Sequence, residues 1–133
     1  MAFARDKFWM FGVKAHQDDI WLVPDWRTEK VTYGISSRIT PAEGAFMLDI
    51  PNVLMIQCDG VPAPFSEDAY GYMESFCAMD RVLWGSVGSG GFRVGNEEEF
   101  VCRLAEQYPN ITGVYLDDVT KLVTVVPSRV KWN

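Results

Sequence analysis

Short apolar runs recur along the chain and are separated by segments with helical character. The apolar runs at 8–13, 53–56, 82–88 and 111–116 have the length of buried strands, and each leads into a polar or glycine-containing loop. The segments between the last three runs place apolar residues three or four positions apart, as amphipathic helices do. The pattern predicts an α/β fold of repeating strand–helix units with a parallel sheet, in a single domain spanning residues 1–133.

Capping residues mark where the helices should begin. Thr40 can cap a first helix, with Pro41 at its first position and Glu43 completing a capping box. Ser66 opens a second helix and Asn96 caps a third. Three strand–helix steps followed by a fourth strand are therefore expected.

Three further segments do not fit this alternation. A short strand is predicted at 31–35, and the β-branched run at 122–126 predicts another strand near the end of the chain. The segment at 21–26, rich in Trp and Pro, has no predicted element.

Charge and composition exclude several classes of function. A net charge of -6 and a pI near 4.7 argue against a nucleic-acid binder, which concentrates Lys and Arg on one face. The apolar run at 8–13 is too short for a signal peptide or a membrane helix, so we expect a cytoplasmic protein without a membrane partner. The three cysteines have no CxxC spacing, and no Cys/His set resembles a zinc site.

Acidic residues and the only histidine follow the predicted strands. They are His16, Asp18 and Asp19 after the first, Asp59 after the second, and Asp117 and Asp118 after the fourth. The carboxyl ends of parallel strands share one edge of a sheet, where ligands bind in α/β folds. We therefore expect five carboxylates and a histidine on one rim.

Three kinds of chemistry suit such a rim. Paired carboxylates perform glycoside hydrolysis, one protonating the leaving oxygen and the other acting as nucleophile or activating water. Aspartates also bind Mg²⁺ or Ca²⁺, and each single aspartate can instead cap the helix that follows it. We expect no cofactor, with a divalent cation as the alternative. Most of the five Trp residues should fill the core, but the surplus suits stacking against sugar rings, and Trp84 is the candidate for that role.

The segment Ile111–Asp118, with the sequence ITGVYLDD, resembles the fourth strand of glycoside-hydrolase-type (β/α)₈ (TIM) barrels. It resembles the chitinase pattern only in part, because Val119 stands where that pattern has its catalytic Glu. Together with 12–19 and 39–52, it resembles the N-terminal half of a bacterial barrel family associated with sugar hydrolases. The resemblance implies that Asp117 or Asp118 is catalytic and that His16 and Asp19 bind substrate.

A full barrel needs about 250 residues, whereas this chain supplies four strands and the three helices between them. The chain is then a half-barrel completed by a homodimer, a fragment of a longer protein, or a small open parallel sheet. We expect a hydrolase domain that acts on a carbohydrate ligand through Asp117 and Asp118, with substrate bound by His16, Asp18, Asp19, Asp59 and Trp84. The alternatives are a non-catalytic module that binds carbohydrate or a divalent metal, and an inactive barrel fragment.

Overall fold

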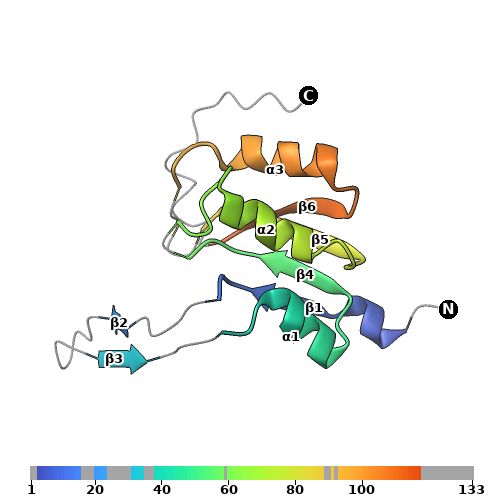
Figure 1. The fold of residues 1–133 in the computed structure, drawn as a ribbon, viewed down its shortest axis with the longest axis horizontal. Helices are drawn as coiled ribbons and strands as arrows, with labels where there is room; N and C mark the ends of the chain where they lie inside the picture. Colours follow the sequence, from blue (N-terminus) through green and yellow to red (C-terminus); the bar gives the residue numbers. More distant parts are fainter. Residues whose placement is uncertain are drawn as a thin grey trace.

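The computed structural model describes residues 3–15, 20–23, 31–34, 38–58, 60–88, 91 and 93–117, with the backbone alone at 20–23 and 31–34. Its main sheet has four parallel strands in the order β1 (Trp9–Gly12), β4 (Asn52–Met55), β5 (Arg81–Val87) and β6 (Ile111–Leu116) (Figure 1). Helices α1 (Pro41–Leu48), α2 (Glu67–Ser75) and α3 (Glu97–Gln107) alternate with these strands. The predicted α/β fold of βα units with a parallel sheet is confirmed.

All three helices cover one face of the sheet. Gly12 and Trp84 lie in one row across the strands, so their side-chain positions face the same way. At Gly12 an added Cβ would come within 2.7 Å of Pro41 in α1, so only glycine allows this approach. The Trp84 ring packs against Phe76, at the end of α2, and Phe100 of α3, with centroid separations of 6.4 and 5.7 Å.

The hydrophobic core lies between this face and the helices. It is formed by fully or almost fully buried side chains of β4, α2, β5 and α3: Val53, Met55, Ala69, Met73, Phe76, Val82, Trp84, Phe100, Val101 and Leu104. Strand β1 and helix α1 lie at its margin, where Met10 and Ala42 are partly buried and Ala45 of α1 is 1% exposed.

The opposite face of the sheet is concave. Phe11, Leu54, Leu83 and Gly113 form a row across it, and no helix of the described part of the chain covers it. Phe11 of β1 and Tyr115 of β6 make an edge-to-face ring contact with a centroid separation of 6.1 Å. Because two strands separate β1 from β6, a flat sheet would hold these strands roughly 14 Å apart. The ring contact therefore requires the sheet to curl toward this face.

Two of the predicted helix caps are confirmed in detail. The Thr40 hydroxyl accepts a hydrogen bond from the Glu43 N–H, and the Glu43 carboxylate accepts one from the Thr40 N–H, both at 3.3 Å. The Ser66 hydroxyl accepts from the Ala69 N–H at 3.1 Å. Asn96 does occupy the N-cap position of α3, but its side chain makes no capping bond, so that part of the prediction was wrong.

Other elements differ from the predictions. The short strand expected at 31–35 is β3 (Val31–Gly34), and it pairs antiparallel with β2 (Ile20–Val23), in a segment without a predicted element. A 3₁₀ helix, η1 (Ala4–Lys7), precedes β1 and was also not predicted. The strand predicted at 122–126 lies outside the described residues. None of the described helices is long and apolar enough to cross a membrane.

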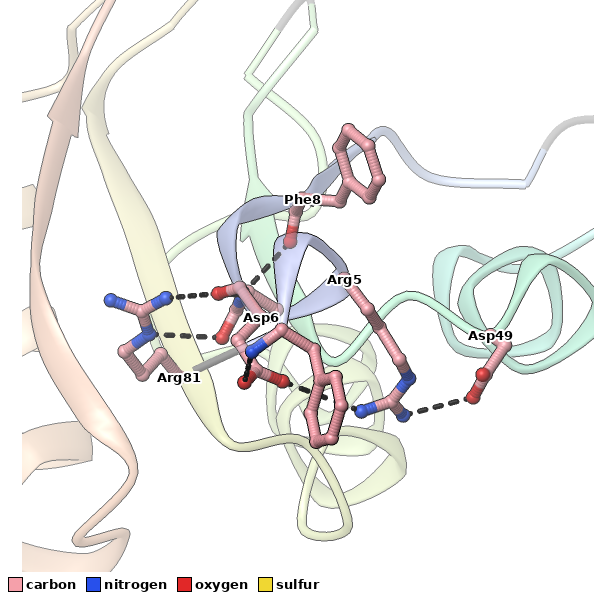
Figure 2. A network of polar contacts seen from close by, with 7 residues as sticks. Arg5, Asp6, Phe8, Asp49 and Arg81 are labelled. Atoms are coloured by element: carbon pink, nitrogen blue, oxygen red, sulfur yellow. Dashed lines mark hydrogen bonds and ion pairs between the residues drawn. The ribbon is translucent and has the colours of Figure 1, made fainter. Parts of the chain in front are cut away.

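A network of hydrogen bonds joins η1 to the amino ends of the strands (Figure 2). The buried Asn52 amide donates to the carbonyl oxygens of Asp6 and Phe8 at 3.0 and 2.8 Å, and it accepts from the Arg81 guanidinium at 3.0 Å. Arg81 also donates to the Asp6 carbonyl at 2.6 Å. These polar groups satisfy one another, so this edge of the sheet is closed by structural contacts.

Arg5 extends the network to α1. Its guanidinium binds the Asp49 carboxylate at 2.8 Å, and this hydrogen bond lowers the pKa of Asp49 below its usual value. Both groups are exposed, so solvent screens the pair and its contribution to stability is small.

Candidate functional site

The carboxyl ends of the four parallel strands lie together at the edge of the sheet opposite η1. After β1, the chain is held against α2 at two points. The Lys14 ammonium pairs with the Asp68 carboxylate at 2.7 Å, and the Ala15 N–H donates to the Tyr72 hydroxyl at 2.8 Å. Residues 13–15 therefore leave β1 along a defined path against α2.

A tight turn follows β4. Cys58 and Val61 exchange two backbone hydrogen bonds of 3.1 Å each, and Gly60 has a positive φ of 77°. The left-handed conformation is available to glycine without a steric cost, which explains this residue in the turn.

The loop between β5 and α3 is closed by a buried carboxylate. Glu97 accepts hydrogen bonds from the backbone N–H groups of Val94 and Gly95, and Arg93 lies 4.0 Å away. This carboxylate at the start of α3 thus stabilises the loop. Its bonds go to backbone groups that precede α3, so it does not replace Asn96 as a cap of the helix.

Gln57 lies just beyond β4, and its buried side-chain amide lacks hydrogen bonds to the described residues. It is 1% exposed, and neither its amide oxygen nor its amide nitrogen has a hydrogen-bond partner within the described part of the chain. Gly88 packs directly against it, since an added Cβ at Gly88 would lie 2.8 Å from the Gln57 carbonyl oxygen. Burying an unpaired polar group costs about 1–3 kcal/mol, so such a group in a folded protein calls for an explanation.

Sequence reasoning did not select Gln57. Its signal was nonetheless present, because residues two apart on a strand share a face and Gln57 continues the series Val53 and Met55. A long amide at a position that faces the core is unusual unless it has a partner.

The structure locates two of the predicted site residues. Asp117 is the first residue after β6; it is half-buried, and its backbone N–H donates to the Val87 carbonyl at 3.2 Å. Trp84 lies entirely within the core, and its indole N–H has no partner among the described residues. Its ring is held between helices and sheet and has no exposed face for a sugar. The remaining predicted site residues lie outside the described part: His16, Asp18, Asp19, Asp59 and Asp118.

The described residues contain no group of three or more His, Cys, Asp or Glu side chains that could hold a metal ion. Asp68 and Glu97, in the first turns of α2 and α3, are engaged in the structural contacts described above. Asp117 and the Gln57 amide, which directly follow β6 and β4, make no side-chain hydrogen bond with the described residues.

Comparisons of the chain with protein-family models, with curated proteins and with solved structures found no match.

Proposed function

We propose that this chain is a glycoside-hydrolase-like domain that binds a carbohydrate at the carboxyl edge of its parallel sheet. Asp117 and Asp118 are the proposed reacting carboxylates, and His16, Asp18, Asp19 and Asp59 surround the substrate. The observation that carries the proposal is the position of Asp117, directly after β6 on the edge where parallel α/β folds bind ligands.

The strand order supports the convergence of the other residues. β1, β4 and β6 all run in the same direction, so the segments that follow them leave the sheet at the same edge. His16, Asp18 and Asp19 come shortly after β1, and Asp59 comes after β4. Trp84 is left out of the proposed site because its side chain is buried in the core.

Gln57 is added to the proposed site. A buried amide with both a free donor and a free acceptor matches the hydroxyl groups of a sugar, each of which also donates and accepts. In the proposed reaction, one carboxyl group protonates the glycosidic oxygen while the other attacks the anomeric carbon or activates water. Which carboxyl group has which role depends on their separation and their pKa values.

The test is a comparison of three Asp→Asn variants with aryl glycosides as substrates. Asp117→Asn and Asp118→Asn should each lower kcat by about 10²–10⁴, because each removes a group that transfers a proton or forms a bond in the transition state. Asp49→Asn is the matched control, since Asp49 is an exposed carboxylate next to α1 at the opposite edge. It should leave kcat unchanged.

Binding is measured in parallel through the thermal shift that mono- and oligosaccharides cause. A saturable shift with no turnover in the wild-type protein would indicate a binding module instead of an enzyme. The absence of both turnover and a thermal shift would overturn the proposal.

A further inference from the structure

The last turn of α1 exposes three consecutive apolar side chains. Pro41 and Ala45 are the buried residues of this helix, and they lie one turn apart on the side that packs against the sheet. Phe46, Met47 and Leu48, which we call the α1 patch, are 88%, 69% and 66% exposed. Three successive residues span more than half the circumference of a helix. Most of the surface of this turn is therefore apolar and exposed.

The composition of α1 differs from that of α3. The exposed residues of α3 include Glu99, Arg103 and Glu106, as expected for a helix between a core and water. The sequence of α1 is PAEGAFML, in which Glu43 is the only charged residue, and its carboxylate takes part in the capping box. A helix that is apolar all round is normally covered on all sides. The exposed part of α1 thus has the composition of a contact surface.

The size and shape of this surface suit a second helix. Large apolar side chains carry about 150–200 Å² each, so the α1 patch exposes roughly 400 Å², as much as the apolar patches that often serve as binding surfaces. Ala42 and Phe46, one turn apart, form a row with a hollow on either side. The hollow toward the end of α2 has a volume of about 340 Å³, and the more open one, which Met47 also lines, has about 370 Å³. Helices pack by placing the side-chain rows of one into the grooves of the other.

Carboxylates outnumber cations around the two hollows. Among the described residues that line them, the charged groups are the Arg5 guanidinium and the carboxylates of Asp49, Asp80 and Glu43. Arg5 is paired with Asp49 (Figure 2) and also lies 3.7 Å from the Asp6 carboxylate, so its charge is already compensated. The exposed Asp80 and Glu43 then leave an excess of negative charge beside the apolar surface. Such surroundings attract Lys and Arg and repel anionic groups.

We infer that α1 docks an amphipathic helix of a partner protein whose apolar stripe is flanked by Lys or Arg. The apolar stripe packs on the α1 patch, and a basic side chain lies beside Asp80, in the way amphipathic helices bind apolar grooves. Charge disfavours two other occupants. A two-fold dimer through this surface would place the same carboxylates opposite each other, and an anionic membrane would be repelled by them. The inference does not rest on the proposed function, because α1 ends at the edge of the sheet opposite the carboxyl rim.

The test is the binding of labelled synthetic peptides to the full chain, measured by fluorescence anisotropy at physiological ionic strength. The probe is a helical peptide of about 20 residues with Leu at helical spacing and Lys elsewhere. One control peptide has Gln in place of Leu and keeps the charge; another has Glu in place of Lys and keeps the apolar stripe. The Leu/Lys peptide should bind at least tenfold more tightly than either control. Equal binding of either control, or no binding of the Leu/Lys peptide, would overturn the inference.

Variants of the chain locate the binding surface. Phe46→Ser should weaken binding of the Leu/Lys peptide at least tenfold, because it removes the most exposed side chain of the α1 patch, whereas Val94→Ser, at an exposed position before α3, should not. Asp80→Asn should weaken binding severalfold and lower its salt dependence, with Glu99→Gln on the exposed side of α3 as the matched control. All four side chains are exposed, so the fold should persist, as far-UV circular dichroism would check. Wild-type affinity of both Phe46→Ser and Asp80→Asn would refute docking at α1.

Two further measurements test the other occupants. Sedimentation equilibrium of the full chain should show no self-association that Phe46→Ser abolishes, since that result would assign the α1 patch to a second copy. Flotation with phosphatidylcholine and phosphatidylserine vesicles should leave the protein unbound. Vesicle binding that is lost in Phe46→Ser would assign the patch to a membrane, and either outcome would overturn the inference.

Amide hydrogen exchange of the wild-type protein gives an answer that does not depend on how the variants fold. When the Leu/Lys peptide is added, the segment 42–49 should become protected, while α3 should not change. Protection confined to the carboxyl rim of the sheet would contradict docking at α1.

Discussion

Two buried amides, one at the first residue of β4 and one just beyond its last residue, allow one prediction to be worked out in detail. Gln57 and Asn52 are each 1% exposed, but the Asn52 amide makes three hydrogen bonds and the Gln57 amide makes none within the described residues. The same kind of substitution, from an amide to an apolar side chain of similar size, should therefore have opposite effects at the two positions.

Gln57→Met keeps the volume and removes two unsatisfied polar atoms. Because leaving a buried polar group unpaired costs about 1–3 kcal/mol, the free energy of unfolding should rise by about that amount. The melting temperature of a chain of this length should rise by roughly 3–4 °C for each kcal/mol. Asn52→Leu leaves the Phe8 carbonyl without its donor and the Arg81 Nε–H without its acceptor, although Arg81 keeps its bond to the Asp6 carbonyl, so the free energy of unfolding should fall by about 3 kcal/mol.

Urea denaturation monitored by tryptophan fluorescence measures both changes, with equal m-values as the sign that the unfolded states are alike. The reasoning is refuted if Gln57→Met lowers the free energy of unfolding by more than about 1 kcal/mol, because the wild-type amide must then have partners in the folded protein. If Gln57 belongs to the carbohydrate site, the stabilised variant should also lose the thermal shift caused by sugars. That combination of higher stability and weaker binding is expected where a polar group is kept for a ligand.

Two further predictions concern a helix cap and a titrating group. Thr40→Ala removes the hydroxyl that caps α1 and should lower the free energy of unfolding by about 1 kcal/mol, measured by urea denaturation, whereas an unchanged value would show that the cap contributes nothing. Burial raises the pKa of Tyr108, with the nearby Glu74 adding to the effect. The neutral form is therefore favoured by folding, so this contribution to stability is complete below the ordinary pKa of tyrosine and is lost as the pH rises through the raised value. An absorbance titration should show a late-titrating tyrosine that disappears in Tyr108→Phe, and identical titrations of the two proteins would contradict this assignment.

Local rules were sufficient for the elements whose signals lie within a few residues of sequence. The capping box of Thr40 and Glu43 marked the start of α1, and the apolar runs marked the four parallel strands. Helix capping and strand burial each require particular residue types at neighbouring positions, so both can be recognised from a short stretch of sequence. Asn96 failed as a cap because its backbone, with φ of -117° and ψ of 12°, is not in the extended conformation of the Thr40 and Ser66 caps, and residue type alone does not set that conformation.

Predictions that depended on the direction of a side chain were less successful. Trp84 occurs in a strand next to a glycine-rich loop, and the sequence did not reveal that its ring would face the helices. Gln57 was missed although it continues the core-facing series of Val53 and Met55, because its lack of hydrogen-bond partners depends on the packing around it. The η1 helix depends on hydrogen bonds with Asn52 and Arg81, which lie far away in the sequence, so its formation could not be predicted locally.

The strand pairings also suggest an order of assembly. β4 and β5, and likewise β5 and β6, are joined by one helix each, whereas β1 pairs with β4 only after the chain has passed through the β2–β3 hairpin. Residues of β1 and α1 stay at the margin of the core, so the segment from β4 to β6 can collapse around Trp84 without them. On the ribosome, the first strand to emerge would then be the last to join the sheet, because the Arg81 that holds η1 in place is synthesised 75 residues after Asp6.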